Sequence, residues 1–590
     1  MRYNIKQIFV LIMFITFTTA CAEMLDPKFD NMLSEEQIEG TSQNFLGPVL
    51  RAYSQIDNQF PVDMDKLTDN AVDNSFTGVW SICGNGGFRP DNNPLENIKQ
   101  CYEVIRSLNA FIPKLIINEG ATIPTPVRFY ALITPQDSID NIRVINRSKG
   151  EAYFLRAYWR NELLRNYAGR IQDGKTVLGY PIIGDSVLNS SDDLNIPRGS
   201  YDDCVAEIVN DCDSAIKYLP LQYKGTDRVT GQTFNDRASG IAAMALKARV
   251  LLYAASPAFN PTDDQTKWVV AARYAGEAIK AIGGTSVKLA NYDDYYFKKL
   301  NNGVFQIPDI IFRANVLGNN STLERNNYPL GMYGNASIGV SQNFVDAFPD
   351  QNGYPITESP IYNESDPYIN RDPRLDMYVA YNGTKLGPKD YYTLNTYTGG
   401  ADAYFPLKNT SRTNYYLKKL IRTDVVDFRP SSKVNTARAR IILGLPELYL
   451  NYCEAAARAW GVKNDPEMFG FSAYDVLLKI QARYKGKPNF LNEVIGTDVE
   501  KFIKYVLNER RLELSFEGHY FYDLRRNIPN NNVLSLNVEV YGIEIDKISN
   551  SSFTYQKRYL ETRDFQSLYM PIPYDEIANA KAIEQNYGWE

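Results

Sequence analysis

The sequence predicts a mainly α-helical protein with a smaller part that is rich in loops and β-strands. In several stretches apolar residues recur at three- and four-residue spacing, which places them on one face of a helix. Between residues 283 and 442 this spacing gives way to frequent Asn, Gly, Pro and Tyr, and the alternating segments 374–380 and 414–421 predict strands. The chain of 590 residues is long enough for several layers of core.

The predicted helices come largely in consecutive pairs. The pairs are residues 151–167 with 201–219, 238–255 with 265–282, and 446–460 with 472–484. Ser200 or Asp202 can cap the second of these helices and Pro220 can end it. The pairs resemble tetratricopeptide hairpins with long, unequal insertions between them, and a general helical core is the alternative within the same fold class.

Three further stretches complete the prediction before the first pair. Residues 43–53 and 95–112 are expected to be helical, and Pro113 is a natural stop for the second helix. Residues 69–93 are rich in Asn, Gly and Asp, so we expect a long loop there.

Residues 501–527 carry an unusual concentration of charge on an amphipathic helix and the turn at Gly518 that follows it. The charged set is Glu509, Arg510, Arg511, Glu513, Glu517, Asp523, Arg525 and Arg526. The glutamates are four residues apart, and such a stripe of like charge is destabilising unless it is matched. Guanidinium forks suit bidentate pairing, so we interpret the set as a structural ion-pair network. Acid–base catalysis by paired carboxylates is the alternative, and it is disfavoured because the arginines hold the carboxylates ionised.

The same stretch resembles the C-terminal motif of the SusD/RagB family, E-R-R-x-E-L-x-F-E-G-H-R-x-x-D-L-R-R, with Tyr520 in place of the arginine and Asn527 where tryptophan is common. F-L-R-A-Y at residues 154–158, P-R-G-S-Y at 197–201 and A-L-K-A-R-V-L-L-Y at 245–253 also resemble that family, as does the closing segment 568–589. The chain is therefore identified as similar to the SusD-like outer-membrane nutrient-binding lipoproteins of Bacteroidota.

This resemblance implies a SusD-like domain over residues 41–590. Its tetratricopeptide-like helical part would cover 41–290 and its C-terminal region 291–590. The implied function is that of a surface-exposed outer-membrane lipoprotein that binds oligosaccharide and delivers it to a SusC-like TonB-dependent transporter, without enzymatic activity or a cofactor. A peptide- or glycoprotein-binding homologue, a surface glycosidase and a non-binding scaffold are the alternatives.

The first residues have the pattern of an export signal. Arg2 and Lys6 precede an apolar run from residue 8 to residue 17, which is too short to span a bilayer. Thr18-Thr19-Ala20-Cys21 then resembles a bacterial lipobox, so we expect residues 1–20 to be removed and Cys21 to carry acyl chains such as palmitate. Residues 21–40 would form the lipidated tether. Ordinary secretory cleavage after Ala20 is the alternative.

Composition points to the kind of ligand. The net charge of −6 argues against nucleic acid as a partner. The chain contains 42 Tyr and 28 Phe, and flat rings with a polar edge suit sugar binding. Two stretches combine aromatic rings with polar side chains, and we expect some of their residues to form one shallow, exposed platform. The candidates are Phe76, Trp80, Asn85, Arg89, Tyr292, Tyr295 and Tyr296. For Trp80, packing beneath the loop is an equally weighted alternative.

Searches for catalytic and metal-binding motifs in the sequence find none that is complete. The single histidine, His519, is interpreted as a core or corner residue. Cys204 and Cys212 would lie about 12 Å apart along one helix, too far for a disulfide, whereas pairing of Cys83 with Cys101 stays open. Residues 350–353 resemble part of a calcium loop but lack its further ligands, so calcium binding also stays open.

Overall fold

The structure is a computed structural model that describes residues 42–115, 127–189, 191–297, 307, 309–316, 322–422, 438–484, 487–549 and 552–589. The predicted export signal, Cys21 and the tether lie outside the described residues. The chain divides into two compact units, Met1–Gly47 with Ile116–Ile142, and Pro48–Leu115 with Arg143–Glu590.

The described part of the first unit is small. It holds α3 (Ser42–Phe45), whose Phe45 ring meets Phe129 edge-on at 6.4 Å between ring centroids. It also holds the first two turns of α7 (Pro135–Tyr167), a helix that continues into the second unit. Asn141 accepts hydrogen bonds from the backbone amides of Phe129 and Tyr130, so the loop before α7 is fastened to the helix.

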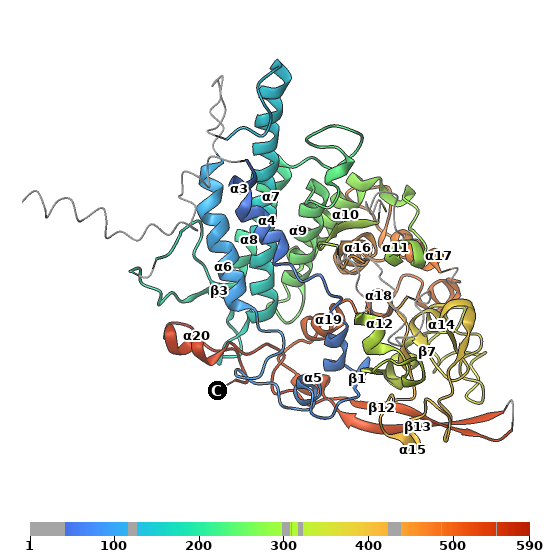
Figure 1. Ribbon diagram of the computed structural model, residues 1–590. Helices are drawn as coiled ribbons and strands as arrows, with labels where there is room; N and C mark the ends of the chain where they lie inside the picture. Colours follow the sequence, from blue (N-terminus) through green and yellow to red (C-terminus); the bar gives the residue numbers. More distant parts are fainter. Residues whose placement is uncertain are drawn as a thin grey trace, which may run out of the picture. The chain divides into compact units, whose positions relative to one another are not determined.

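Helices are the main secondary structure of the second unit (Figure 1). Besides the second part of α7, its α-helices are α4 (Gly47–Ser54), α5 (Val79–Gly84), α6 (Ile98–Phe111), α8 (Tyr201–Tyr218), α9 (Gly240–Ala255), α10 (Gln265–Ile282), α11 (Tyr292–Phe297), α12 (Thr322–Asn327), α13 (Gln342–Ala347), α14 (Arg374–Tyr378), α15 (Tyr404–Leu407), α16 (Leu445–Trp460), α17 (Ala473–Arg483), α18 (Val499–Glu513), α19 (Tyr520–Arg526) and α20 (Tyr574–Asn579). The mainly α-helical prediction is confirmed.

Predicted helix boundaries agree with the structure wherever the apolar spacing is clear. α10 has the predicted ends, and α8, α9, α16 and α17 each differ by at most two residues. The Ser200 side chain caps α8 by accepting a hydrogen bond from the amide of Asp203. α7, in contrast, starts at Pro135 rather than at residue 151, because its first half is polar and shows no apolar stripe.

The paired helices pack in sequence. α8 contacts α9, α9 contacts α10, and α16 contacts α10, α17 and α18 (Figure 1). Ala242, Ala245 and Ala248 of α9 are buried, which allows close helix approach. Gly276 of α10 has the same role, because a Cβ atom there would lie 2.2 Å from the ring of Phe469.

Apart from one long hairpin the strands are short, and some pair segments that are far apart in sequence while others pair locally. β1 (Ala71–Asp73), β6 (Ile338–Val340), β10 (Tyr416–Leu417) and β7 (Val379–Ala380) form an antiparallel sheet in that order, and β12 (Glu539–Lys547) and β13 (Phe553–Thr562) form a long hairpin. The remaining strands pair as β5 (Ile310–Arg313) with β11 (Ile441–Gly444), β8 (Lys385–Leu386) with β9 (Tyr392–Thr393), and β2 (Gly169–Arg170) with β3 (Val177–Pro181) and β4 (Arg198–Ser200).

Two predicted strands are only partly right. Residues 374–378 form α14, because the Asp372 carboxylate accepts the Arg374 amide and starts a helical turn. In residues 414–421 only β10 is a strand, since Asn414 and Leu420 have φ values of 61° and 67° that interrupt an extended chain. The expected loop over 69–93 contains β1, whose partner β6 is remote in sequence, and the short helix α5.

The corner between α18 and α19 is tighter than expected. α18 ends at Glu513, and Phe516 and Gly518 have φ values of 61° and 81°, so Glu517 lies beyond the helix and not on its stripe of glutamates. A buried carboxylate, Asp65, braces this turn by accepting hydrogen bonds from the Phe516 amide (3.0 Å) and from the Asn70 side chain (2.6 Å). Burial raises the pKa of Asp65 to about 7.

Candidate functional site

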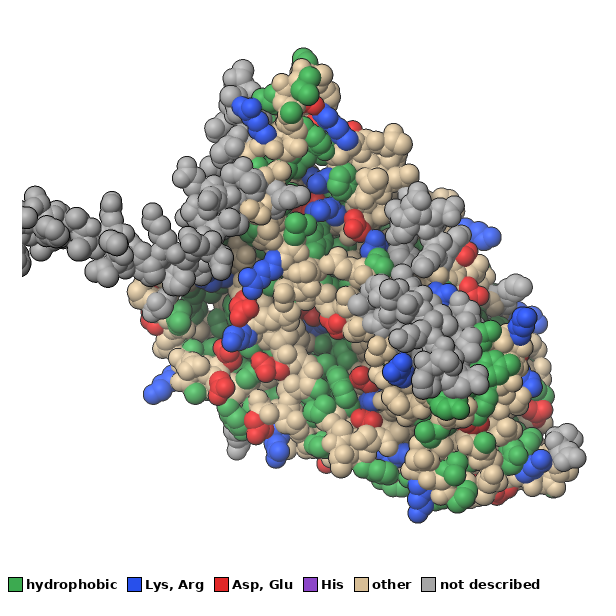
Figure 2. Space-filling view, viewed as in Figure 1, with side chains coloured by type: hydrophobic (Ala, Val, Ile, Leu, Met, Phe, Trp, Pro, Cys, Tyr) green, Lys and Arg blue, Asp and Glu red, His purple; other side chains and the backbone are tan. Residues whose placement is uncertain are grey.

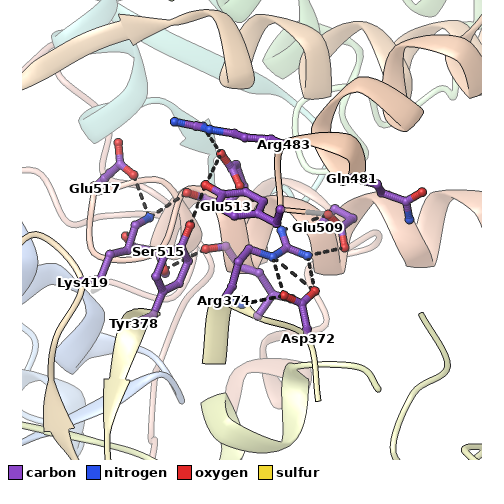
Figure 3. A network of polar contacts seen from close by, with 12 residues as sticks. Asp372, Arg374, Tyr378, Lys419, Gln481, Arg483, Glu509, Glu513, Ser515 and Glu517 are labelled. Carbon is purple, nitrogen blue, oxygen red and sulfur yellow. Dashed lines mark hydrogen bonds and ion pairs between the residues drawn. The ribbon is translucent and has the colours of Figure 1, made fainter. Parts of the chain in front are cut away.

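The glutamates of the 501–527 stretch bond to residues far away in sequence (Figure 3). Glu509 accepts two hydrogen bonds from the Arg374 guanidinium at 2.9 and 3.0 Å, and Arg374 also binds Asp372 at 2.7 Å. Glu513 pairs with Arg483 at 2.6 Å, and Glu517 pairs with the buried Lys419 at 2.8 Å. The prediction of a matched network is right in kind, but these partners do not come from within the stretch.

The arginines of the stretch follow two patterns. Arg510 and Arg526 both bind Asp523, and Arg526 also binds Glu454 at 2.6 Å. Arg511 pairs with Asp69 at 2.9 Å, and the Tyr520 hydroxyl donates to the same carboxylate at 3.1 Å, so Tyr520 shares the anchor of Arg511.

Arg525 has no carboxylate within ion-pair distance in the described chain and lies over the ring of Phe521, at 3.6 Å from its centroid. Burial lowers the pKa of Arg525 to about 9. It therefore does not belong to the ion pairs that we predicted.

The space beside Arg374 and Glu509 is too small for a sugar. The cavity next to Arg374 and Glu509 measures about 10 Å³, enough for one water molecule at most. The geometry is that of a buried brace and gives no support for a glycosidase site at this corner.

The tyrosine cluster 292–296 was predicted to be exposed, and this prediction is wrong. Tyr292, Tyr295 and Tyr296 are 7%, 4% and 5% exposed. Their spacing places all three rings on the inner face of α11, while Asp293 and Asp294 fall on the outer face. The acidic residues between the tyrosines therefore do not indicate that the rings are exposed. The Leu420 amide donates to the Tyr292 hydroxyl at 2.7 Å.

Replacing Tyr292 by phenylalanine is expected to lower the free energy of unfolding by about 1–2 kcal/mol, because the buried amide of Leu420 loses its acceptor. Chemical denaturation measures this change. Tyr333→Phe, at an exposed ring, is the control and should leave the midpoint unchanged. A Tyr292→Phe variant with native stability but weakened ligand binding would contradict the core assignment.

Phe76 is exposed and has defined neighbours. Its ring, 62% exposed, follows β1 and lies over the guanidinium of Arg412, with 4.2 Å between Cζ and the ring centroid. Arg412 is buried and pairs with Glu561 at 2.8 Å. Glu561 also binds Arg563 at 2.6 Å, which donates to the Asn85 side chain at 3.1 Å.

The other two candidates of this stretch are not part of that chain of contacts. Trp80 is half-buried in α5, so neither a fully exposed nor a fully packed ring describes it. Arg89 is exposed and pairs with Asp91 at 3.6 Å. The structure thus joins Phe76 and Asn85 through Arg412, Glu561 and Arg563, and leaves Trp80 and Arg89 outside.

Further residues extend this surface in the other direction. Arg558 of β13 donates to the carbonyl of Arg412, and its Cζ lies 5.2 Å from the ring centroids of both Tyr404 and Phe405 in α15. We call the set Phe76, Tyr404, Phe405, Arg412 and Arg558 the Phe76 surface. Figure 2 shows hydrophobic and basic side chains interleaved over the region where Figure 1 places β12, β13 and α15.

The sheet explains why these segments meet. β6 pairs with both β1 and β10, which brings the end of β1 beside the segment that precedes β10. The Arg412 amide donates to the Asn74 side chain at 2.9 Å, and its guanidinium donates to the Asp73 carbonyl at 3.0 Å. β12 joins through Gly542, where a Cβ atom would lie 2.8 Å from the Cα of Thr413.

Four residues of the Phe76 surface escaped the sequence analysis. Tyr404 and Phe405 lie in the predicted loop-rich region, residues 283–442, and two adjacent aromatic residues there could have been proposed as binding residues. The sequence contains no signal for Arg412 and Arg558, because it does not show that the segment before β10 packs against the β12–β13 hairpin.

A separate cavity of about 390 Å³ lies between the loop before α9 and β5. Its lining combines aliphatic side chains with amide and charged ones: Ile241, Ile282, Val287, Ile307, Ile310 and Ile311 with Gln222, Gln232, Asn235, Lys224 and Arg237. The one ring in its lining, Tyr223, is buried and donates to the carbonyl of Ala238. It therefore offers no open aromatic face on which a sugar ring could stack.

The described ranges contain neither a cluster of metal ligands nor a disulfide between the predicted cysteines. No group of three or more His, Cys, Asp and Glu side chains there could hold a metal ion. Asp350 instead caps its own turn, accepting the amides of Asn352 and Tyr354. Cys83 and Cys101 are both free, so they form no disulfide.

His519 is buried, as predicted. Among the described helices, none combines the length and the apolar character needed to cross a membrane.

Comparison with known structures gives the fold. A SusD-like protein from Bacteroides fragilis NCTC 9343 superposes with a TM-score of 0.70 at 22% identity, over 95% of this chain and 99% of that one. A SusD-like carbohydrate-binding protein from the same organism gives 0.67 at 17% identity, over 92% and 99%. Surface glycan-binding protein A from Bacteroides uniformis gives 0.57 at 17% identity, over 92% and 99%. No curated protein sequence matches the chain.

Two family models match the sequence itself. The model described as SusD family matches residues 308–589, and the model described as starch-binding associating with outer membrane matches residues 24–252. The matches cover both the helical and the β-rich parts, and the chain belongs to the SusD family of outer-membrane-associated carbohydrate-binding proteins.

Proposed function

We propose that this protein is a surface-exposed lipoprotein that captures an oligosaccharide on the Phe76 surface and delivers it to a SusC-like TonB-dependent transporter. Membership of the SusD family supports this proposal, and similar structures include a carbohydrate-binding protein and a surface glycan-binding protein. The observation that carries it is the exposed ring of Phe76, held from one side by a buried arginine.

The chemistry suits a sugar ring. Sugars present apolar C–H faces, and a flat aromatic ring offers a complementary apolar surface. Arg412 fixes the Phe76 ring in place, so little side-chain freedom is lost on binding. Asn85, also exposed, supplies amide groups that can hydrogen-bond to hydroxyls at the rim.

Attachment to the membrane completes the proposal. Acyl chains on Cys21 would supply the several lipid groups that stable anchoring needs. Residues 22–40 would then link the anchor to the SusD-like domain. In this arrangement the domain can close over the transporter and open again without leaving the membrane.

Replacing Phe76 by alanine is expected to weaken glycan binding roughly 5- to 150-fold, since stacking on one ring is worth roughly 1–3 kcal/mol. A glycan array identifies a ligand for the wild type, and titration calorimetry then compares the variants. The melting midpoint should stay nearly unchanged, because the ring is exposed.

Tyr574→Ala serves as the matched control, since Tyr574 is an exposed ring in α20, outside the Phe76 surface. It should bind as tightly as the wild type. Equal affinities for wild type and Phe76→Ala would remove the assignment of this surface.

A further inference from the structure

Arg558 holds a positive charge that the described chain does not balance. Arg412 beside it pairs with Glu561 at 2.8 Å, a carboxylate that Arg563 shares, whereas Arg558 has no carboxylate within ion-pair distance in the described ranges. Its Nη2 donates to the carbonyl of Arg412, and its Nε is buried without an acceptor. Arg558 as a whole is half-buried.

Neighbouring rings hold this guanidinium in place. Tyr404 and Phe405 each lie 5.2 Å from its Cζ, a distance at which a cation is attracted to an aromatic face. Burial lowers the pKa of Arg558, and Glu544 partly offsets that effect. An arginine nonetheless stays protonated at neutral pH, so the charge persists.

The nearest carboxylate on the same sheet face does not neutralise it. Gly542 and Arg558 are cross-strand partners, and Glu544 with Gln556 is the next pair on that face of the β12–β13 hairpin. Glu544 is on the neighbouring pair and forms no ion pair with Arg558. A second cation, Lys408, is exposed and lies 6.0 Å from the Phe405 ring centroid.

We propose that the Phe76 surface selects acidic oligosaccharides, with the carboxylate of a uronic acid or a sulfate ester bound by Arg558 while a sugar ring packs on Phe76. This inference rests on the proposed function and names its substrate class. A guanidinium fork binds carboxylate or sulfate oxygens with charge-assisted hydrogen bonds, and a neutral sugar would leave that charge unmatched after desolvation. The link through Arg412 places the anion site and the ring on one continuous surface.

Affinity electrophoresis in native gels tests the inference with two matched pairs of polymers. Polygalacturonate and its fully methyl-esterified form differ in the carboxylate, and carrageenan and its chemically desulfated form differ in the sulfate. At least one charged polymer should retard the wild type more than its neutral partner does. Which pair shows the difference identifies the anion as carboxylate or sulfate.

Arg558→Gln should then raise the dissociation constant for the charged polymer roughly ten-fold or more, the usual effect of losing a charged hydrogen-bond partner. Arg558→Lys, which keeps the charge but not the fork, should fall between the two. Lys557→Gln is the matched control, because it removes one charge from the opposite face of the same strand and should leave binding unchanged. Thermal melting checks that each variant folds.

Equal retardation by charged and neutral forms, or unchanged binding of the charged form by Arg558→Gln, would overturn the inference. It would also be overturned if the wild type bound none of the four polymers while binding a neutral array glycan through Phe76, and the proposed function would then stand. If no array glycan bound at all, the proposed function would fail as well.

Discussion

Replacing Arg374 by methionine is expected to lower the free energy of unfolding by about 3–5 kcal/mol, the usual cost of removing one partner from a buried ion pair. Arg374 is buried and is held between Asp372 and Glu509, with Glu513 at 3.6 Å. Without the guanidinium these three carboxylates would remain buried with like charge. The fold would then have to protonate them or open to water.

Chemical denaturation of the purified protein measures this loss. Arg273→Met is the matched control, because Arg273 binds Glu467 at 2.8 Å on the surface, where water and salt screen the pair. The control should leave the denaturation midpoint almost unaltered. If both variants lost the same amount of stability, the buried network would not be the special feature of this corner.

A second large effect is expected from His519 and pH. Burial lowers the pKa of His519 to about 3, against an ordinary value of 6.5, and Glu447 only partly opposes this. Between these values the unfolded chain binds a proton that the folded chain does not. The contribution of His519 to stability is therefore fully present above pH 6.5 and is lost as pH falls toward 3, by about 1.4 kcal/mol per pH unit.

The test compares wild type with His519→Asn, which cannot titrate, by urea denaturation at several pH values between 4 and 8. The difference in unfolding free energy between the two proteins should change with pH below 6.5 and stay constant above it. His519 is the single histidine of the chain, so its imidazole signals in NMR report the folded-state pKa directly. A constant difference across the whole range would show that His519 titrates normally.

How far the sequence predicts this structure depends on whether the signal is local. Helices such as α10 follow from apolar spacing, which each segment carries by itself. The sequence shows the charged residues of 501–527 as a set, but it does not show how they pair. Arg374, Lys419 and Arg483 lie 30 or more residues from the glutamates they bind. Phe76 could be proposed from the sequence as an exposed loop aromatic. Arg412 could not, because it comes near Phe76 only through a sheet whose strands have two to three residues. Arg558 could not either, because its place depends on the packing of the β12–β13 hairpin.

The tyrosines show a different limit. Many of them lie in the core and satisfy their hydroxyl groups there, as Tyr378 and Tyr484 do with each other at 3.0 Å. Composition alone cannot separate such a core ring from a binding ring, because both use the same apolar face and polar edge. The acidic neighbours of Tyr292 were a misleading guide, since helical geometry places them on the opposite face.

The brace of Asp65 at the Phe516 turn has a consequence for the proton content of the protein. Asp65 has a folded pKa of about 7, so it holds a proton in the folded state from about pH 4 to 7, which its unfolded form releases. The contribution of Asp65 to stability therefore falls as pH rises, whereas the contribution of His519 falls as pH drops. His519 lies three residues after Phe516, whose turn Asp65 braces. Between about pH 4 and 6.5 unfolding therefore moves one proton from a carboxyl to an imidazole. In that range the two groups together exchange no net proton with solvent.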